Sequence, residues 1–194
     1  MRVLLLLALL MTPAALALFG GLSLSKRAQL KNDILELANK TQRGLRINSE
    51  EEIRMQEMFS SLEKLNPNKN SLSSSLLNGT WDLQYTTSDA ILSKKSSFKP
   101  VGKILQKLDL QKLTAENSEV IDYGLFKMPR KVTAELKPTS KSAVAVQFKE
   151  FSFFNWLKVK APASFKGTLD ITYLDEDVRL SRGDKGNIFV LTKM

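Results

Sequence analysis

Three adjacent acids, Asp175, Glu176 and Asp177, form the cluster in this chain that comes closest to a chemical site. Carboxylates can act as general acids or bases, and they can bind a cation. These three lack the glycine-punctuated spacing of a calcium loop, and the sequence has no His and no Cys. A histidine general base, a Ser-His-Asp triad and a Cys/His zinc site are therefore excluded. We expect no catalytic residue, no metal and no cofactor, and so a protein that is not an enzyme.

Arg182 is a charged residue whose position predicts a specific contact. Alternate residues of the segment 178–182 share one face of a strand, and the two that share a face with Arg182 are apolar. A guanidinium that points into apolar surroundings needs a partner. The ring of Trp81 is the natural candidate, through a cation–π contact. On the same alternation Arg179 should point outward and pair with an acid of the preceding turn.

Two segments carry an apolar residue at every second position, which is typical of half-buried strands. Inside a barrel of about eight strands, such residues line a space that can hold one small ligand. Filling a solid core is the simpler alternative. The candidate ligand-binding residues from these segments are Trp81, Leu83, Tyr85, Leu169, Ile171 and Tyr173.

The segment 148–157 is half aromatic. Phe151 and Phe153 share one strand parity, whereas Phe154 and Trp156 share the other, so both faces are apolar. We expect Phe151 and Phe153 to belong to the ligand-binding set, with the opposite face against a helix or a lipid surface. Burial of the segment under the N-terminal helices is the alternative.

The first part of the chain has helical periodicity. Residues 27 to about 40 have apolar side chains at helical spacing, and Gly44 supplies a stop. A second helix is expected to begin at Ser49 with a capping box, and to end before Asn66-Pro67. Its expected apolar stripe is Ile53, Met58, Leu62 and Leu65. The linker from Asn66 to Ser75 should be an exposed loop.

From Leu76 onward the period changes to two, and short strands follow one another with polar turns between them. This pattern favours an antiparallel barrel or sandwich over βαβ units. The expected strands begin with that of Trp81 to Tyr85 and continue over 104–110, 119–123, 131–136, 143–148, 151–157, 167–174, 178–182 and 187–192.

The N-terminus has the composition of a targeting segment. A positive start, an apolar run over 3–11 and the small residues around Ala17 predict a signal peptide over 1–17. Residues 18–27 contain Ser, Lys and Arg but no acid, as a transit-type element would. We therefore divide the chain into a signal peptide (1–17), a transit-like segment (18–27), helices and linker (28–75) and a barrel domain (76–194).

The net charge of +9 lies in the middle of the chain. Residues 94–166 hold 15 basic and 6 acidic side chains, a net +9, while the flanking parts nearly cancel. Such a field attracts acidic lipid headgroups or nucleic acid. A solvated lysine-rich face that keeps the protein soluble is the alternative.

Four motifs resemble those of the plastid lipid-associated protein family, also called fibrillins. They are Thr-Gln-Arg-Gly at 41–44, Leu-Glu-Lys-Leu-Asn-Pro at 62–67, the strand that opens at 77–88, and above all the nineteen residues from Thr172 to Val190. The resemblance implies a mainly β fold, namely a lipocalin-like antiparallel β-barrel preceded by two short α-helices. It supplies no catalytic residues.

The resemblance also implies a function. We expect this chain to bind, sequester or organise apolar lipids such as prenyl lipids, carotenoids or fatty acids, at plastid lipid bodies (plastoglobules) and thylakoid membranes. A secretory-type leader would bring it to the plastid; secretion is the alternative. The expected partners are an apolar lipid and an acidic membrane or lipid-body surface, and the resemblance argues against nucleic acid. A coat protein of lipid particles, with a filled barrel and no ligand, is the competing hypothesis.

Overall fold

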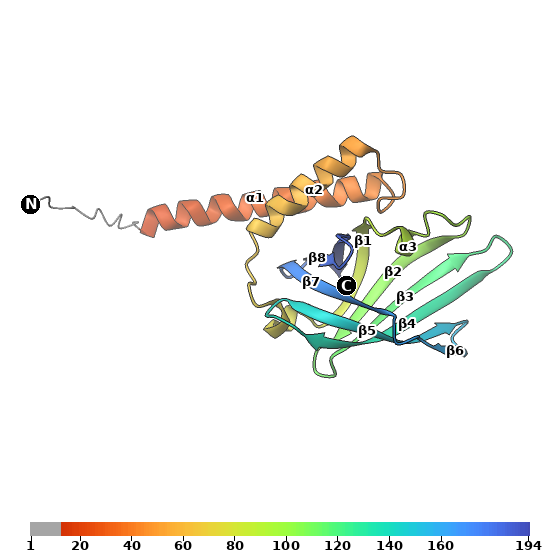
Figure 1. Ribbon diagram of the computed structural model, residues 1–194. Helices are drawn as coiled ribbons and strands as arrows, with labels where there is room; N and C mark the ends of the chain where they lie inside the picture. Colours follow the sequence, from red (N-terminus) through yellow and green to blue (C-terminus); the bar gives the residue numbers. More distant parts are fainter. Residues whose placement is uncertain (1–12) are drawn as a thin grey trace, which may run out of the picture.

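The computed structural model describes residues 13–194, with side chains described from Leu24 onward. Two helices lie against one side of a barrel of antiparallel strands (Figure 1). The apolar run of the expected signal peptide lies outside the described residues. The last residues of that peptide belong to the backbone of the first helix.

Helix α1 (Pro13–Lys40) ends where the sequence predicts, and it begins well before residue 27. A turn with left-handed backbone at Gln42, Arg43 and Gly44 follows it. Within residues 13–194, none of the helices combines the length and the apolar character that a membrane span requires.

Helix α2 (Ser49–Lys64) is capped by Asn48, and the expectation of a Ser49 cap was wrong by one residue. The Asn48 side chain accepts a hydrogen bond from the Glu51 backbone at 2.9 Å, and the Glu51 carboxylate accepts one from the Asn48 backbone at 3.2 Å. This capping box satisfies two free N–H groups of the first turn. The expected stripe was also partly wrong, because Ile53 is 62% exposed and the buried residues are Met55, Met58, Phe59 and Leu62.

The linker after α2 is bound to the barrel, and only half of its residues have the exposure that its composition predicts. Asn66 is buried, and its side-chain amide donates hydrogen bonds to the carbonyls of Thr172 at 2.9 Å and Asn68 at 3.0 Å. Two short 3-10 helices follow, η1 (Ser71–Ser73) and η2 (Ser75–Leu77). They place Leu77 in the barrel core.

Eight strands close the barrel in the order β1-β2-β3-β4-β5-β7-β8-β9, with β4 paired to β5 and β9 paired to β1. The ninth strand, β6, pairs only with β5 and lies beside the ring. A four-residue helix, α3 (Asp89–Leu92), connects β1 to β2. The strands are β1 (Gly79–Thr86), β2 (Lys99–Asp109), β3 (Thr114–Asp122), β4 (Lys127–Pro138), β5 (Ala143–Phe153), β6 (Leu157–Lys160), β7 (Lys166–Leu174), β8 (Val178–Gly183) and β9 (Ile188–Lys193).

The segments 143–148 and 151–157, which we expected to be separate strands, form β5 and the hairpin into β6. The register of β5 against β4 shifts at Lys149, so one extra residue is inserted there. A bulge of this kind exchanges the two faces of a strand beyond it.

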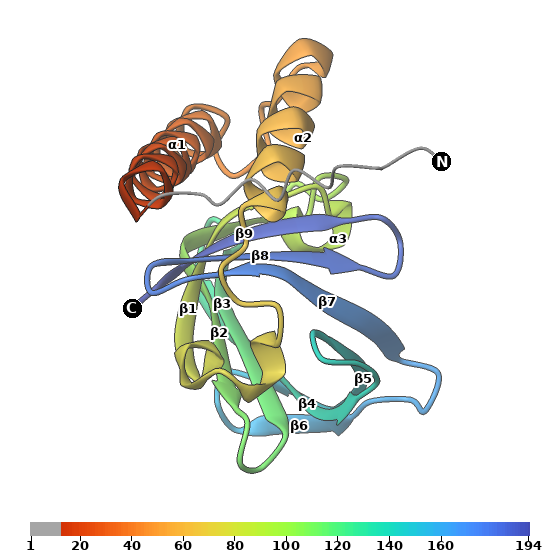
Figure 2. The same ribbon diagram turned by 90° about the vertical axis from the view of Figure 1, so that its left-hand side faces the viewer.

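Two apolar cores lie on opposite sides of the barrel wall. The inner core gathers around Trp81, Leu83 and Leu174. The outer core joins α1 and α2 to the outside of β1, β7, β8 and β9, and Phe59 of α2 is fully buried in it. Figure 2 shows both helices above β8 and β9, outside the barrel.

Candidate functional site

Trp81 anchors one end of the barrel interior. Its side chain is fully buried, and its indole N–H donates a hydrogen bond to the Leu77 carbonyl at 2.9 Å. Two cations face its ring: the guanidinium of Arg179 at 4.9 Å and the ammonium of Lys193 at 4.5 Å from the ring centroid. A cation over the face of an indole is attracted by the ring quadrupole, most strongly where water is excluded.

Arg179 is a cation held inside the barrel without a carboxylate partner. It is 1% exposed, and one terminal nitrogen donates to the side-chain oxygen of Gln106. Gln106 in turn donates to the side chain of Asn117 at 2.9 Å. Among the residues that the structure describes, the Nε and Nη1 atoms of Arg179 have no hydrogen-bond partner. Burial lowers the pKa of the Arg179 guanidinium to about 9, so the group still carries its charge at neutral pH.

The prediction that Arg182 contacts Trp81 was wrong, and so was the outward placement of Arg179. Arg182 does share a face with Val178 and Leu180, but that face points to the helices. Its guanidinium donates to both carboxylate oxygens of Glu63 in α2, at 2.8 and 2.7 Å, and lies 4.9 Å from the ring centroid of Phe59. The apolar surroundings that the alternation implies are therefore the helix side of the wall.

The prediction that Tyr85 and Tyr173 line the barrel interior was also wrong. Both are fully buried, but in the outer core beneath the helices. The register shifts between Leu83 and Tyr85, and again between Ile171 and Tyr173. Each shift turns the next alternate side chain outward.

The remaining five expected residues lie on the inner side. Leu83 and Ile171 are buried in the inner core, and Leu169 packs against it. Past the Lys149 bulge, Phe151 pairs with Val132 and Phe153 with Arg130. Val132 has the same parity along β4 as Leu136, a member of the inner core, so Phe151 and Phe153 face inward as well.

The alternative burial of the 148–157 segment under the N-terminal helices is wrong. Trp156 is 74% exposed and Phe154 is 39% exposed. The hairpin that carries them lies on the far side of the barrel from α1 and α2 (Figure 1).

A second group of polar residues lies on the inner side, in addition to the hydrogen-bonded series Arg179, Gln106 and Asn117. Arg130 donates to Glu119 at 2.6 Å, and the two residues pair across β3 and β4. The Nε atom of Arg130 and the second carboxylate oxygen of Glu119 are buried, and neither has a hydrogen-bond partner in the described part of the chain. The interior therefore combines an apolar surface with hydrogen-bonding groups that have capacity left, which suits an apolar molecule with a polar group.

The polar members of this interior were missed by sequence reasoning, namely Gln106, Asn117, Glu119, Arg130, Arg179 and Lys193. The available signal was parity, because Gln106 has the parity of Ile104 and Leu108, and Asn117 and Glu119 have that of Ala115 and Ile121. A polar residue at an inward position is easily mistaken for a solvent-facing one.

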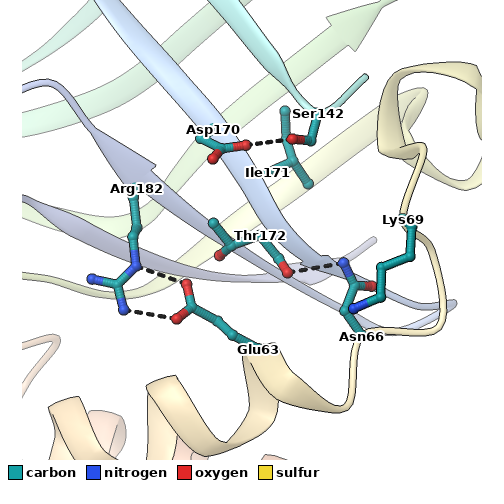
Figure 3. A pocket seen from close by; sticks show the side chains of 8 residues that line it. All are labelled: Glu63, Asn66, Lys69, Ser142, Asp170, Ile171, Thr172 and Arg182. Atoms are coloured by element: carbon teal, nitrogen blue, oxygen red, sulfur yellow. Dashed lines mark hydrogen bonds and ion pairs between the residues drawn. The ribbon is translucent and has the colours of Figure 1, made fainter. Parts of the chain in front are cut away.

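Two hollows on the molecule differ in character. One of about 360 Å³ lies outside the barrel, where the end of α2 meets β7 and β8 (Figure 3). Its lining is polar apart from Ile171, and Glu63 and Arg182 bind each other across it, so it does not suit an apolar ligand. The other, of about 680 Å³, lies along β4, β5 and β7 and includes Leu136 and Val146 in its lining.

Two acids of the turn 175–177 are bound by other side chains of the protein. Lys31 of α1 binds Asp175 at 2.9 Å and Asp177 at 3.0 Å. The hydroxyl of Tyr173 donates to Asp175 at 2.6 Å. These contacts attach α1 to the β7–β8 turn. Within the described residues, no group of three or more acidic side chains is placed to hold a metal ion.

A closed antiparallel barrel of eight strands, with an inner face that is largely apolar, defines the class of small up-and-down barrels that includes the lipocalins. The chain belongs to the PAP_fibrillin family, whose family model matches residues 28–192. This match confirms the resemblance that the four motifs indicate. No solved structure matches the chain.

Curated relatives agree with this assignment. The chain is 35% identical over 171 residues to "Probable plastid-lipid-associated protein 5, chloroplastic" of Arabidopsis thaliana, covering 87% of this chain and 70% of the relative. It is 27% identical to "Chromoplast-specific carotenoid-associated protein, chromoplastic" of Cucumis sativus, over 85% of this chain and 67% of the relative. It is 25% identical to "Plastoglobulin-1, chloroplastic" of Pisum sativum, over 84% and 60%.

Proposed function

We propose that this chain is a lipid-binding protein of plastids that holds an apolar molecule inside its barrel, at the surface of lipid bodies or thylakoid membranes, and performs no covalent chemistry. Prenyl lipids, carotenoids and fatty acids are the candidate ligand classes. The family and the names of the relatives support association with plastid lipid in general.

One observation carries the binding proposal. Several side chains on the inner side, away from Trp81, remain partly exposed although they point inward. An inward side chain in a filled core would be buried at the density typical of protein interiors. Partial exposure therefore supports space beside these residues, which are Val132, Val146, Phe148, Phe151 and Phe153.

The second candidate is a coat protein whose barrel is filled. The Trp81 end supports it, because Trp81, Leu83, Ile171 and Leu174 form a continuous buried cluster there. The two candidates differ at the opposite end of the interior. In the first that end admits a ligand, whereas in the second its side chains close on one another.

Titration with cis-parinaric acid separates the two candidates. The fluorescence of this conjugated fatty acid rises when it enters an apolar site. The binding proposal predicts a saturable rise with one molecule bound per chain. A rise that does not saturate, or none, would favour the filled coat protein.

A further inference from the structure

Five aromatic rings from three separate segments form a continuous row at one end of the barrel. Because all pairings are antiparallel, the ends of β3 and β5 meet the starts of β2 and β4 there. Neighbouring ring centroids are 4.6, 5.1, 6.0 and 6.5 Å apart along the row. We call this row the aromatic rim; in spatial order it consists of Phe98, Tyr123, Phe126, Phe154 and Trp156.

The aromatic rim is open to solvent. Trp156 is 74% exposed, and Leu125 at the tip of the β3–β4 hairpin is 99% exposed. Phe98, Phe126 and Phe154 are each exposed by at least 39%. A contiguous exposed apolar patch of this kind marks an interaction site, since burial of each such side chain is favourable.

The backbone of the β5–β6 turn is strained at the aromatic rim. Phe154 has φ of 50° and Asn155 has φ of 64°, both in the left-handed region. Positive φ at two successive turn residues favours Asn-Gly, and a bulky aromatic at positive φ is uncommon. Strain of this kind clusters at functional sites. Here it holds Phe154 in the row, 6.0 Å from Phe126.

The charges around the aromatic rim are mostly positive. The three segments that carry it, 94–99, 123–127 and 154–160, contain six lysines and no acid. The acids beside these segments are fewer, and two of them bind rim lysines: Asp89 binds Lys94 and Glu150 binds Lys158. Trp156 is followed by β6, where Leu157 and Val159 alternate with Lys158 and Lys160, and all four are exposed. Aromatic rings beside lysines are typical of segments that lie at the boundary between acyl chains and headgroups.

We propose that the aromatic rim inserts into the headgroup region of an acidic lipid surface, so that the end of the barrel opposite Trp81 faces the lipid. Charge complementarity identifies the occupant, because the excess of lysines over acids at the rim fits a phosphate- or sulfate-bearing lipid layer. This inference deepens the proposed function, on which it rests for the presence of lipid. It adds the surface of contact and the orientation of the barrel.

The two tryptophans make the test direct. Trp81 is fully buried and Trp156 is 74% exposed, so a change in emission on vesicle binding reports Trp156. The purified protein is mixed with vesicles of phosphatidylcholine alone, or of phosphatidylcholine with phosphatidylglycerol. We expect a blue shift and protection of Trp156 from aqueous iodide on the acidic vesicles only. An unchanged spectrum on acidic vesicles overturns the proposal.

Matched variants distinguish insertion of the aromatic rim from non-specific adsorption of the protein to vesicles. Leu125→Ser, Phe126→Ser and Trp156→Ser should each weaken binding to acidic vesicles about tenfold, from the loss of one buried apolar side chain. Ile53→Ser, at an equally exposed apolar position on α2, should leave binding unchanged. Sedimentation of the variants with vesicles measures both. Equal binding by rim and control variants contradicts the proposal.

Lysine variants test the electrostatic part. Lys95→Glu and Lys127→Glu lie within the rim segments, and each should weaken binding to acidic vesicles by about tenfold at low salt. The same change at Lys64, at the end of α2, should have no effect. Equal binding to neutral and acidic vesicles would refute this part.

The other occupants of this surface are separate outcomes. If rim variants convert a concentration-dependent dimer to a monomer, the aromatic rim is an interface between two copies of the chain, and the lipid proposal fails. Rim variants that still bind cis-parinaric acid but not vesicles support the proposal. A protein that binds vesicles through the rim and takes up no cis-parinaric acid would refute ligand binding by the barrel and leave this inference standing.

Discussion

The guanidinium of Arg179 lies 4.9 Å from the ring centroid of Trp81, inside the barrel and away from water. Lys193 faces the same ring at 4.5 Å. The Arg179 contact joins β1 to β8, which are not neighbours in the sheet, because β9 lies between them. It therefore ties one end of the barrel together across its interior.

Replacement of Arg179 should separate its volume from its charge. Arg179→Ala removes a large buried side chain and should lower the free energy of unfolding by about 2–4 kcal/mol. Arg179→Met fills most of the space and removes a desolvated charge, and should cost less than about 1 kcal/mol. Urea unfolding followed by tryptophan fluorescence measures both. If Arg179→Met is as damaging as Arg179→Ala, the cation itself stabilises the barrel.

Position 44 requires glycine for two reasons: its backbone has a positive φ, and there is no room for a Cβ atom. It has φ of 96°, and a Cβ there would lie 2.8 Å from the Thr86 carbonyl oxygen and 3.0 Å from the Tyr85 ring. Gly186 also has positive φ, 71°, but a Cβ there meets nothing within 4 Å. Gly186→Ala should cost about 1 kcal/mol from the left-handed backbone alone. Gly44→Ala should cost at least about 1 kcal/mol more, because the clash adds to the same strain. Similar melting temperatures for the two variants would contradict this account.

The contact between Lys31 and Asp175 should make the attachment of α1 depend on pH. Burial raises the pKa of Asp175, but hydrogen bonds from Tyr173 and Lys31 outweigh it, so the pKa lies below its ordinary value of 3.8. A lowered folded-state pKa contributes stability above the ordinary pKa, and this is lost as pH falls through the folded pKa. Burial lowers the pKa of Lys31, but its two acids raise it above 10.5 overall, so its contribution is lost only at alkaline pH.

Lys31→Met should therefore cost about 1 kcal/mol at neutral pH, and the cost should shrink as pH falls below 3.8. Urea unfolding at a series of pH values measures the difference. Lys26→Met, an exposed lysine on the same helix, is the matched control and should show no such dependence. A cost for Lys31→Met that persists undiminished at low pH would show that packing, and not charge, attaches α1.

Two adjacent positions on β4, one inward and one outward, allow a controlled test of ligand binding inside the barrel. Val132 points inward, opposite Phe151, whereas Thr133 points outward. Val132→Trp should occupy the proposed ligand space and weaken cis-parinaric acid binding at least about tenfold, since overpacking alone costs about 1–3 kcal/mol. Thr133→Trp adds the same volume outside and should leave the affinity unchanged. Circular dichroism of both variants checks that the barrel is intact.

The alternation of the sequence predicted the barrel, but two bulges decided which residues line it. Trp81, Leu83 and Tyr85 alternate without interruption in sequence, yet the register shift after Leu83 turns Tyr85 to the helices. Tyr173 is displaced in the same way. A bulge is created by pairing with the neighbouring strand, so a single strand's sequence does not reveal it.

The arginines show why face and environment must be assigned together. The alternation placed Arg182 correctly on the apolar face of β8, but that face lies against the helices outside the barrel. The inward positions of β8 hold the buried polar residues Arg179 and Ser181. Arg182 forms an ion pair with Glu63 on α2, which lies more than a hundred residues away in sequence. Local alternation contains no information on which side the helices pack.

The proposed function requires that the barrel holds an apolar lipid. Native mass spectrometry of the protein after incubation with a plastid lipid extract measures this lipid. We expect one lipid molecule bound per chain, retained by Thr133→Trp and lost from Val132→Trp. A chain that carries no lipid, or equal lipid retention by the two variants, would contradict it.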